Sequence, residues 1–403
     1  MNHFISDMQR AALFAALLCG LPWGVEAADT ACVPVATWGV PAAAGAKPIA
    51  VTELMPRAAK QSVVLLGESH DSADDHRWQL QTIAALYAQR PQMAIAFEAF
   101  PRRVQPVLDR WVAGEFTEAQ FLKAVDWYRV WNFDPQLYLP LFNFARINRV
   151  PMIAMNVDIA LIRSISAKGF SEIPVDAREG VSSPAAASQT YLDSLFEIYG
   201  DHQPPAIAEH KGKVAPPDRN DPAFKRFVES QQFWDRAMAQ AMAEAAKRPG
   251  APLVIGIVGR GHVENGYGIA HQLADLGVKN VMSLLTWRDA YGCKTLTAGY
   301  ADALFGLAPE AKDATPARPR LGVAFETAGK ELRVTSVEKG SIAETTGIQT
   351  GDVIFEAAGV PLKEFMELRA VIQRQAPGTW LPLKVKRGSE TLELIAKFPP
   401  AQS

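Results

Sequence analysis

Five short apolar runs between residues 63 and 285 constrain the fold of this chain more than any other feature. They occupy residues 63–67, 93–98, 151–156, 253–259 and 281–285 and are rich in Val, Ile, Leu and Met. Runs of this length, bounded by glycine or polar residues, are typical of strands that are buried on both faces. Segments with helical periodicity separate them. Strands that alternate with helices predict an α/β fold with a mostly parallel sheet and helices on both faces.

Three of the intervening segments carry helix signals. Residues 73–89 place their apolar side chains on one face at helical spacing. Thr117 is followed three residues later by Gln120, the pattern of a capping box, and a helix is predicted to start there. A third helix is predicted from the Asp-Pro pair to the Pro-Gly pair that bound residues 221–250.

The length and composition allow more than one domain and exclude one class of partner. A chain of 403 residues can bury two or three sizeable cores. The proline-rich segment 306–319 is predicted to link an α/β domain at 28–305 to a small β-rich domain at 320–400. The formal net charge is −2, and the chain carries no basic stripe interleaved with aromatic residues, so no nucleic-acid partner is expected.

The amino terminus is typical of an export signal. Residues 11–21 are apolar but too few to span a bilayer, and small side chains at Val25 and Ala27 suit cleavage after Ala27. Residues 1–27 are therefore predicted to be a signal peptide of an exported, periplasmic protein, with an uncleaved anchor as the alternative. Leu18 stands before Cys19 where a lipoprotein signal has a small residue, so lipid anchoring is not expected.

Cleavage would leave Cys32 and Cys293 as the two cysteines of the mature chain. In an oxidising compartment they can pair, or they can stay as separate thiols, and the sequence leaves both alternatives open.

The sequence also leaves the role of the segment 200–221 undecided. It carries four prolines and two histidines, His202 and His210, and fits either a flap over a pocket or a solvated insertion.

Polar residues follow four of the five apolar runs, and ligands of open parallel sheets bind outside the carboxyl ends of the strands. These residues are, in chain order, Glu68 and His70, Glu98, Asn156 and Asp158, and Arg260 and His262. Two histidines with carboxylates match the ligand set of zinc, manganese or another divalent metal. A metal-bound water would make the site a hydrolase, with Glu68 or Glu98 as the base. Hydrogen-bonded structural roles are the alternative for each residue.

Two other kinds of enzyme site do not fit the motifs. Ser69 lies in G-E-S-H, which lacks the G-x-S-x-G pattern of a serine hydrolase. The glycines of residues 259–268 lack both the lysine of a phosphate-binding loop and the spacing of a dinucleotide-binding motif.

Several ordered motifs give residues 50–290 a family resemblance. LLGESHD (65–71), AFEAF (96–100), the segment 127–158, QQFWDRAMA (231–239) and GRGHVENGYGIAHQL (259–273) resemble the ChaN-type haem-binding uptake proteins of the Tiki and erythromycin-esterase-like superfamily. The resemblance implies haem binding linked to iron acquisition, with Tyr and His at a haem that two chains share. It implies Tyr267 as a candidate haem ligand and His262 and Arg260 as further candidate haem-binding residues.

The same superfamily includes metal-dependent hydrolases with paired G-x-x-H motifs and a glutamate. Gly67–His70 and Gly259–His262 match those motifs, and Glu68 and Glu98 match the acidic positions. A haem also needs an apolar slot, and its walls are expected among aromatic residues that otherwise belong to the core. They are Trp127, Trp131, Phe133, Tyr138, Phe142 and Phe144.

The carboxyl-terminal domain resembles a bacterial PDZ domain in RLGVAF (320–325), in the segment 337–359 and in the helix that follows. Such domains add a peptide as a strand and hold its terminal carboxylate on main-chain N–H groups. The resemblance places the carboxylate loop and the groove helix at Leu321, Gly322 and Val323, and at Phe365 and Leu368. A groove used only for packing within the chain is the alternative.

Three functions therefore compete. The chain is either an exported haem-binding uptake protein, or a metal-dependent hydrolase, or an adaptor whose PDZ domain acts while the α/β domain serves as a scaffold. The resemblance favours haem binding, and the site residues taken alone favour the hydrolase.

Overall fold

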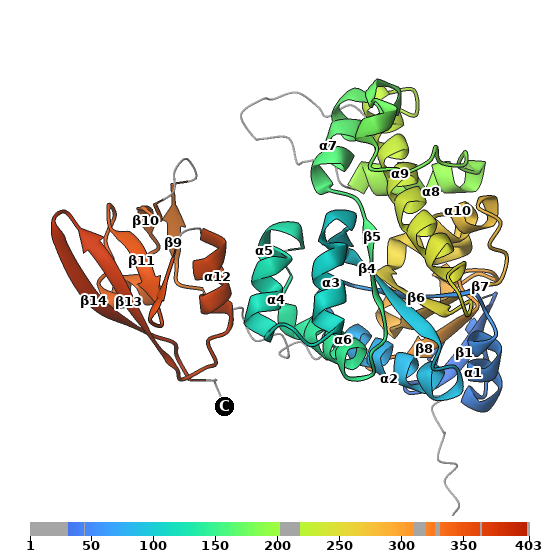
Figure 1. Ribbon diagram of the computed structural model, residues 1–403, viewed down its shortest axis with the longest axis horizontal. Coiled ribbons are helices and arrows are strands. Elements are labelled where there is room, and N and C mark those ends of the chain that lie inside the picture. Colours follow the sequence, from blue (N-terminus) through green and yellow to red (C-terminus); the bar gives the residue numbers. More distant parts are fainter. Residues whose placement is uncertain are drawn as a thin grey trace, which may run out of the picture.

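The computed structural model describes residues 31–43, 45–131, 133–201, 218–309, 320–326, 331–362 and 365–400. They form an α/β domain and a smaller β-rich domain (Figure 1). The predicted signal peptide, most of the predicted linker, and His202 and His210 lie outside the described residues. Within the described residues, no helix is both long and apolar enough to cross a membrane.

An eight-stranded sheet forms the centre of the α/β domain, in the order β2-β1-β8-β7-β3-β6-β4-β5. The strands from β8 to β5 run parallel, and β1 pairs antiparallel with β2 and β8. All five predicted strands are confirmed, as β3 to β7. The strands are β1 (Trp38–Ala42), β2 (Gly45–Ile49), β3 (Val63–Glu68), β4 (Met93–Pro101), β5 (Met152–Asn156), β6 (Leu253–Gly259), β7 (Val281–Trp287) and β8 (Ala303–Gly306).

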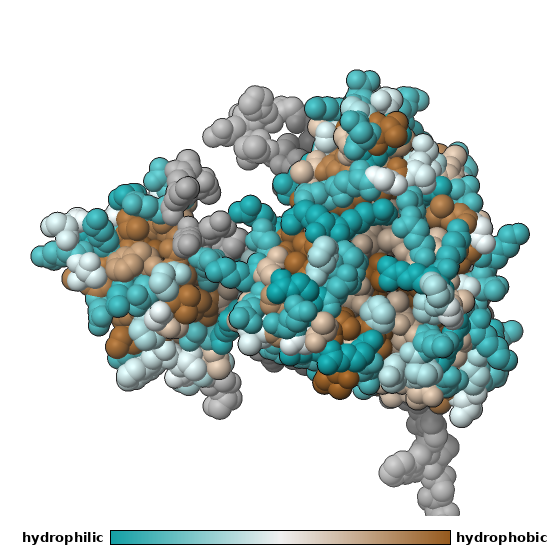
Figure 2. All heavy atoms as spheres, in the orientation of Figure 1, coloured by the Kyte–Doolittle hydropathy of each residue, from teal (hydrophilic) through white to brown (hydrophobic). Residues whose placement is uncertain are grey.

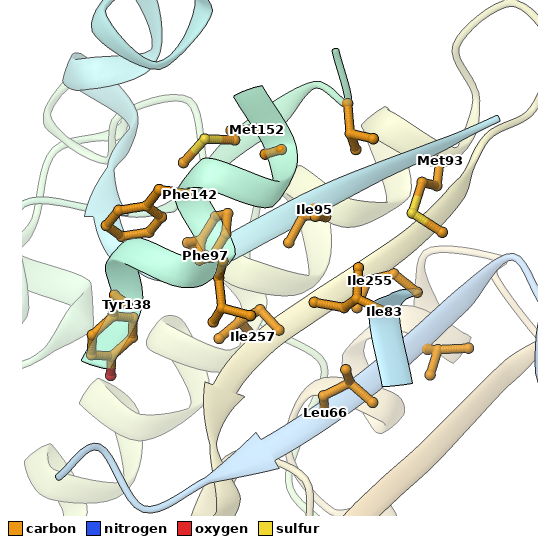
Figure 3. Packing of buried hydrophobic residues seen from close by; sticks show 14 of the residues in the cluster. Leu66, Ile83, Met93, Ile95, Phe97, Tyr138, Phe142, Met152, Ile255 and Ile257 are labelled. Carbon is orange, nitrogen blue, oxygen red and sulfur yellow. The ribbon is translucent and has the colours of Figure 1, made fainter. Parts of the chain in front are cut away.

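Helices cover both faces of this sheet, because successive residues of a strand point to opposite sides. Val64 and Leu66 pack into a core shared with α1 to α6, whereas Val63 and Leu65 pack against α9 and α10. Figure 3 shows the first core, in which strand residues such as Phe97 and Ile257 meet Tyr138 and Phe142 of α6. The helices are α1 (Val51–Ala59), α2 (Ala73–Gln89), α3 (Gln105–Val112), α4 (Glu118–Ala124), α5 (Trp127–Val130), α6 (Pro135–Ile147), α7 (Ile159–Lys168), α8 (Gln189–Asp201), α9 (Pro222–Ala246) and α10 (Ile269–Asp275).

The predicted helix starts are confirmed, and one predicted helix ends early. Thr117 and Gln120 form the capping box of α4. The helical pattern continues beyond Ala124, but Asp126 adopts the left-handed conformation with φ 56° and breaks it. The chain then turns into α5, which leads towards the carboxyl edge of the sheet. This break positions two of the aromatic residues discussed below.

Cys32 and Cys293 form a disulfide with a Cα–Cα distance of 5.3 Å, which settles the pairing that the sequence left open. The bond joins the start of the described chain to the segment after β7. Next to it, β1 pairs with β8, so residues from both ends of the α/β domain complete one side of the sheet.

In its described part, the smaller domain contains two antiparallel sheets and two helices, around a core that includes Leu321, Ile354, Leu368 and Val385. Its helix α12 lies on the side that faces α5 of the α/β domain, where Arg374 donates a hydrogen bond of 3.2 Å to the Tyr128 hydroxyl (Figure 1). Hydrophilic and hydrophobic residues are mixed over the face of both domains seen in Figure 2. The elements are β9 (Val323–Phe325), β10 (Val334–Val337), α11 (Ile342–Thr346), β11 (Val353–Ala357), β12 (Val360–Pro361), α12 (Phe365–Gln373), β13 (Trp380–Arg387) and β14 (Glu390–Lys397).

Candidate functional site

The polar residues predicted at the strand ends do gather at one edge, because β3, β6, β4 and β5 are neighbours in the sheet. A cavity of about 610 Å³ opens there. His70, Glu98, Asn156 and Asp158 of the predicted set line it. The cavity volume lies within the range of small-molecule sites, roughly 300–1,000 Å³.

Glu68 lies behind the cavity wall rather than in it. Its carboxylate is buried and accepts hydrogen bonds from His70 Nδ1 at 2.9 Å, the Tyr138 hydroxyl at 2.5 Å and Gln79 Nε2 at 2.8 Å. Burial alone would raise the pKa of Glu68, but the charge of His76 and the hydrogen bond from His70 outweigh it and lower the pKa. Glu68 therefore orients His70 and is anchored as an anion.

His70 lines the cavity. Its ring lies against Trp131 and Phe133, with centroid distances of 4.7 Å and 5.1 Å. Because Nδ1 is bonded to Glu68, Nε2 is the nitrogen left for a ligand. Burial would lower the pKa of His70, but the hydrogen bond to Glu68 and the charge of Glu98 raise it.

Gly259 at the end of β6 allows the site to close around these groups. A Cβ atom at this position would lie 3.0 Å from His70 Cε1 and 3.1 Å from His70 Nε2, so a side chain would crowd the imidazole ring. The Gly259 N–H donates to Glu98 Oε2 at 2.7 Å. Glu98 is thereby held between His70 and His262, whose Nε2 lies 3.7 Å from Glu98 Oε1.

His262 is held by a helix residue that the strand-end argument did not find. Its Nδ1 lies 2.7 Å from Oδ1 of the buried Asp235 on α9, which also accepts a 2.7 Å bond from the Tyr191 hydroxyl. Burial would lower the pKa of His262, but the charge and hydrogen bond of Asp235, and then the charge of Glu98, raise it to about 9. A charged side chain among the buried residues of α9 is the signal that could have identified Asp235.

The predicted zinc or manganese site gains no support. Over the described ranges, no three His, Cys, Asp or Glu side chains are placed to hold one metal ion. The carboxylates accept hydrogen bonds from protein groups instead, as Glu68 does from Tyr138 and Gln79.

The six aromatic residues divide between the core and the cavity. Trp127, Tyr138 and Phe142 are fully buried in the core, and Phe144 packs against it. Trp131 and Phe133 line the cavity, where Trp234 of α9 joins them from the opposite side of the sheet edge.

Two arginines at the cavity were not predicted. Arg103 forms an ion pair with Asp158 at 2.9 Å, and Arg129 pairs with Asp126 at 3.4 Å. All four residues line the cavity, so its mouth carries paired charges of both signs.

Tyr267 and Arg260 lie away from this cavity. The ring of Tyr267 packs near Tyr191, at a centroid distance of 6.0 Å. The Arg260 guanidinium pairs with Glu264 at 2.7 Å and lies over the ring of Tyr291. Of the three predicted haem-binding residues, only His262 contacts the cluster around Glu98.

A second hollow, of about 510 Å³, lies between β9 and α12 in the smaller domain. Leu321, Gly322, Val323 and Phe365 line it as the sequence predicted. Leu368 does not, because its side chain is fully buried in the core of the domain. Ile372 and Arg369 of the same helix line the groove. Gly322 has φ +81°, and a Cβ atom there would clash with Ser341, so the loop requires glycine.

Many solved structures are similar to this chain, among them the following three. The structure described as cofacial haem binding to ChaN of Campylobacter jejuni is 20% identical, with a TM-score of 0.50, and the match covers 64% of this chain and 92% of that chain. At this identity the likeness shows the fold alone. Around the smaller domain, an HtrA-type protease AlgW with decapeptide is 23% identical over 21% of this chain and 30% of that chain, with a TM-score of 0.19. The HtrA3 PDZ domain with a phage-derived ligand is 25% identical over 19% of this chain and 82% of that chain, with a TM-score of 0.17.

No curated protein sequence matches the chain. Two family profiles do. A PDZ domain profile matches residues 319–397. The family described as haem-binding uptake, Tiki superfamily, ChaN matches residues 54–273, which is more than half of the chain. This chain therefore belongs to the ChaN family of haem-binding uptake proteins in the Tiki superfamily, and it carries a PDZ domain after its α/β domain.

Proposed function

We propose that this chain binds haem in the cavity at the carboxyl edge of the sheet, as an exported protein that serves haem and iron uptake. The observation that carries the proposal is the His70 imidazole. It is held by Glu68 through Nδ1, which leaves Nε2 for a ligand, and it lines a cavity with aromatic walls. Membership in the haem-binding ChaN family supports the choice of ligand.

The residues at the cavity fit a haem. Trp131, Phe133, Val130 and Trp234 offer apolar surface to a porphyrin face. The indole Nε1 of Trp234 is buried and has no hydrogen-bond partner among the described residues, so an acceptor group on a ligand would satisfy it. The walls therefore offer both the apolar surface and a hydrogen-bond donor that an amphipathic ring with carboxylates requires.

His70 would hold the haem iron in this proposal. A bound haem iron supplies ligand exchange and electron transfer, and histidine is a usual axial residue. The hydrogen bond between Nδ1 and Glu68 fixes the ring and makes Nε2 a stronger electron donor. Tyr267, the ligand implied by the resemblance, packs against Tyr191 instead.

Arg103 and Arg129 are proposed to bind the haem propionates. A guanidinium has five N–H donors, so an arginine that already pairs with one aspartate can donate hydrogen bonds to a second carboxylate. Binding would then replace part of the pairing with Asp158 and Asp126 at the cavity mouth.

Export, the periplasmic location and sharing of haem by two copies of the chain belong to the same proposal. The predicted signal peptide supports export, and the Cys32–Cys293 disulfide suits an oxidising compartment. Size-exclusion chromatography with and without haemin would test whether haem joins two copies.

The PDZ domain is proposed to bind the carboxyl terminus of a peptide or a partner protein. Its groove has the glycine turn and the open strand edge that this mode of binding uses.

The first experiment is an absorption titration of the mature protein with haemin, with elemental analysis of the protein as purified. A saturable Soret shift is expected. His70→Ala should abolish this spectrum, Glu68→Gln should weaken affinity by about 10- to 100-fold, and Tyr267→Phe, the control, should change neither.

Two results would contradict the proposal. If Tyr267→Phe loses the Soret shift while His70→Ala keeps it, the axial ligand is Tyr267. If haemin gives no specific shift, and the protein carries stoichiometric zinc or manganese that His70→Ala removes, the metal-dependent hydrolase becomes the better reading.

A further inference from the structure

The longest open strand edge in the described chain belongs to β14. Among the described strands, this eight-residue strand pairs only with β13, so one of its sides has no strand partner. The edge strand β5 differs, because the Gln105 side chain covers it. Gln105 donates to the Met152 carbonyl and accepts from the Ala154 N–H, each at 2.8 Å. An uncovered edge is a template for a strand of another chain.

Four residues of β14 direct their main-chain groups to this open side. Just after β14, the Phe398 N–H donates to the Thr379 carbonyl at 2.9 Å, on the side of β13. Alternate residues of an antiparallel strand direct their N–H and C=O groups to opposite sides, and β14 pairs with β13 without a register shift. Helix α11 lies beside β14, but no main-chain hydrogen bond joins the two in the described part of the chain. The residues with main-chain groups on the open side are therefore Thr391, Glu393, Ile395 and Lys397.

The side chains of these four residues lie on the outer face of the sheet, opposite the core, and all four are exposed. Ile395 is 48% exposed, and its neighbour on β13, Pro382, is exposed as well. The Glu393 carboxylate lies 4.0 Å from Lys384, which has a closer partner in Glu356 at 2.9 Å. The edge therefore carries an apolar side chain between a negative and a positive one, and all three are open to solvent.

The order of these residues makes the edge complementary to a second copy of itself. If two β14 strands pair antiparallel about a two-fold axis at Ile395, each Glu393 lies opposite the Lys397 of the other copy. Two oppositely charged pairs then flank a pair of Ile395 side chains, and cross-strand pairs of both kinds stabilise a sheet. An axis at Glu393 would instead place two glutamates opposite each other, which destabilises the pairing.

We propose that β14 is a self-association surface, at which two copies of this chain pair their β14 strands about an axis at Ile395. The contact is isologous, because the same residues face each other in both copies. It joins two β12-β11-β13-β14 sheets into one continuous sheet. β14 lies on the side of the PDZ domain away from the α/β domain (Figure 1), so this contact is separate from the sharing of haem and needs no haem.

The test is sedimentation equilibrium of the mature chain without haem, up to roughly 0.5 mM, a range in which weak interfaces form. The unmodified chain should form a reversible dimer. Glu393→Lys makes both charged positions of the edge positive, and Lys397→Glu makes both negative. Either variant alone should therefore dimerise roughly tenfold or more weakly.

A mixture of these two variants gives the sharpest result. Opposite charges face each other again at both charged pairs, so the mixture should recover the dimer that neither variant forms alone. Lys386→Glu is the matched control, because Lys386 is exposed on β13, one strand away from the edge. It changes the net charge as Lys397→Glu does and should leave the dimer unchanged.

Ile395→Pro tests the main-chain pairing. Proline removes an N–H group that points away from β13, so the domain should still fold, as circular dichroism would show. The dimer should be lost, because the removed N–H lies at the axis of the contact.

Three results would overturn the inference. The unmodified chain could stay monomeric over this range, the Glu393→Lys and Lys397→Glu variants could each dimerise as tightly as the unmodified chain, or their mixture could fail to recover the dimer. A dimer that forms only when haemin is added would assign self-association to haem instead of β14.

Discussion

The cavity of the α/β domain and the groove of the PDZ domain are built in opposite ways. Buried side chains hold the cavity, with Glu68, Glu98 and Asp235 all at most 3% exposed and each hydrogen-bonded within the protein. The groove depends on main-chain groups of β9 and on side chains such as Phe365 that reach solvent. A substitution at the cavity should therefore disturb several hydrogen-bonded residues at once, whereas a substitution in the groove should affect only the direct contacts of the residue that is replaced.

The largest loss of stability is expected for Glu68→Ala, a substitution in the hydrogen-bond network behind the cavity. The change leaves His70, Tyr138 and Gln79 without their shared acceptor, and we expect the free energy of unfolding to fall by about 3–5 kcal/mol. Urea unfolding of the α/β domain measures it. Glu53→Ala, an exposed carboxylate on α1, is the control and should change stability by about 0.5 kcal/mol or less. Equal effects of the two variants would show that the network around Glu68 is not coupled to folding.

Two residues of α12, Leu368 and Phe365, should differ in how much they stabilise the PDZ domain. Leu368 is fully buried, so Leu368→Ala should destabilise the PDZ domain by about 2–5 kcal/mol. Phe365→Ala removes a partly exposed ring and should cost about 1 kcal/mol or less. Thermal unfolding of each variant measures the difference. A larger loss for Phe365→Ala would mean that this ring supports the core.

The two domains should also respond differently to pH. The pKa of folded His262 is raised to about 9, above its usual unfolded value. The contribution of His262 to the free energy of unfolding is therefore fully present below about pH 6.5. It is lost as the pH rises through 9, which lowers the free energy of unfolding of the α/β domain by about 3 kcal/mol.

Unfolding followed between pH 6 and 9.5 measures this loss. Asp235→Asn should flatten the pH profile, because it removes the main charge that raises the pKa of His262. Residues 320–403 contain no histidine, so the PDZ domain should show no comparable loss in this range. A steep fall that persists in Asp235→Asn would assign the pH dependence to another group.

The smallest effect is expected where the domains touch. Arg374 donates a hydrogen bond to Tyr128 at an exposed position. Arg374→Ala should change the stability of either domain by about 0.5 kcal/mol or less. Calorimetry that resolves the two transitions measures this. A shift of several degrees in both transitions would show that the domains fold as one unit.

The sequence predicted those parts of the fold that depend on local pattern. Strands β3 to β7 are continuous apolar runs, and their parallel order brought His70, Glu98 and His262 to one edge. Strands β1, β2 and β8 were not predicted. Their segments are short, β1 contains Gly39 and Pro41, and the pairing of β1 with β8 depends on residues far apart in the chain.

The differences between the predicted site and the structure have local backbone causes. Asp235 and Trp234 come from a helix, so an argument from strand ends could not place them. Trp131 reaches the cavity because Asp126 turns the chain through a left-handed conformation. A second left-handed residue, Asn265, turns the chain after His262, and Tyr267 then packs against Tyr191 on α8 rather than facing the cavity.

The Cys32–Cys293 disulfide has a mechanical consequence. It joins residues 261 positions apart, and Cys293 lies only a short stretch of chain before the PDZ domain. A pulling force between the amino terminus and the PDZ domain would pass through this bond and that stretch, which includes strand β8 of the sheet, and would bypass strands β3 to β7 and the cavity. With the bond intact, tension could move the PDZ domain, but it could not unravel the residues enclosed between the two cysteines.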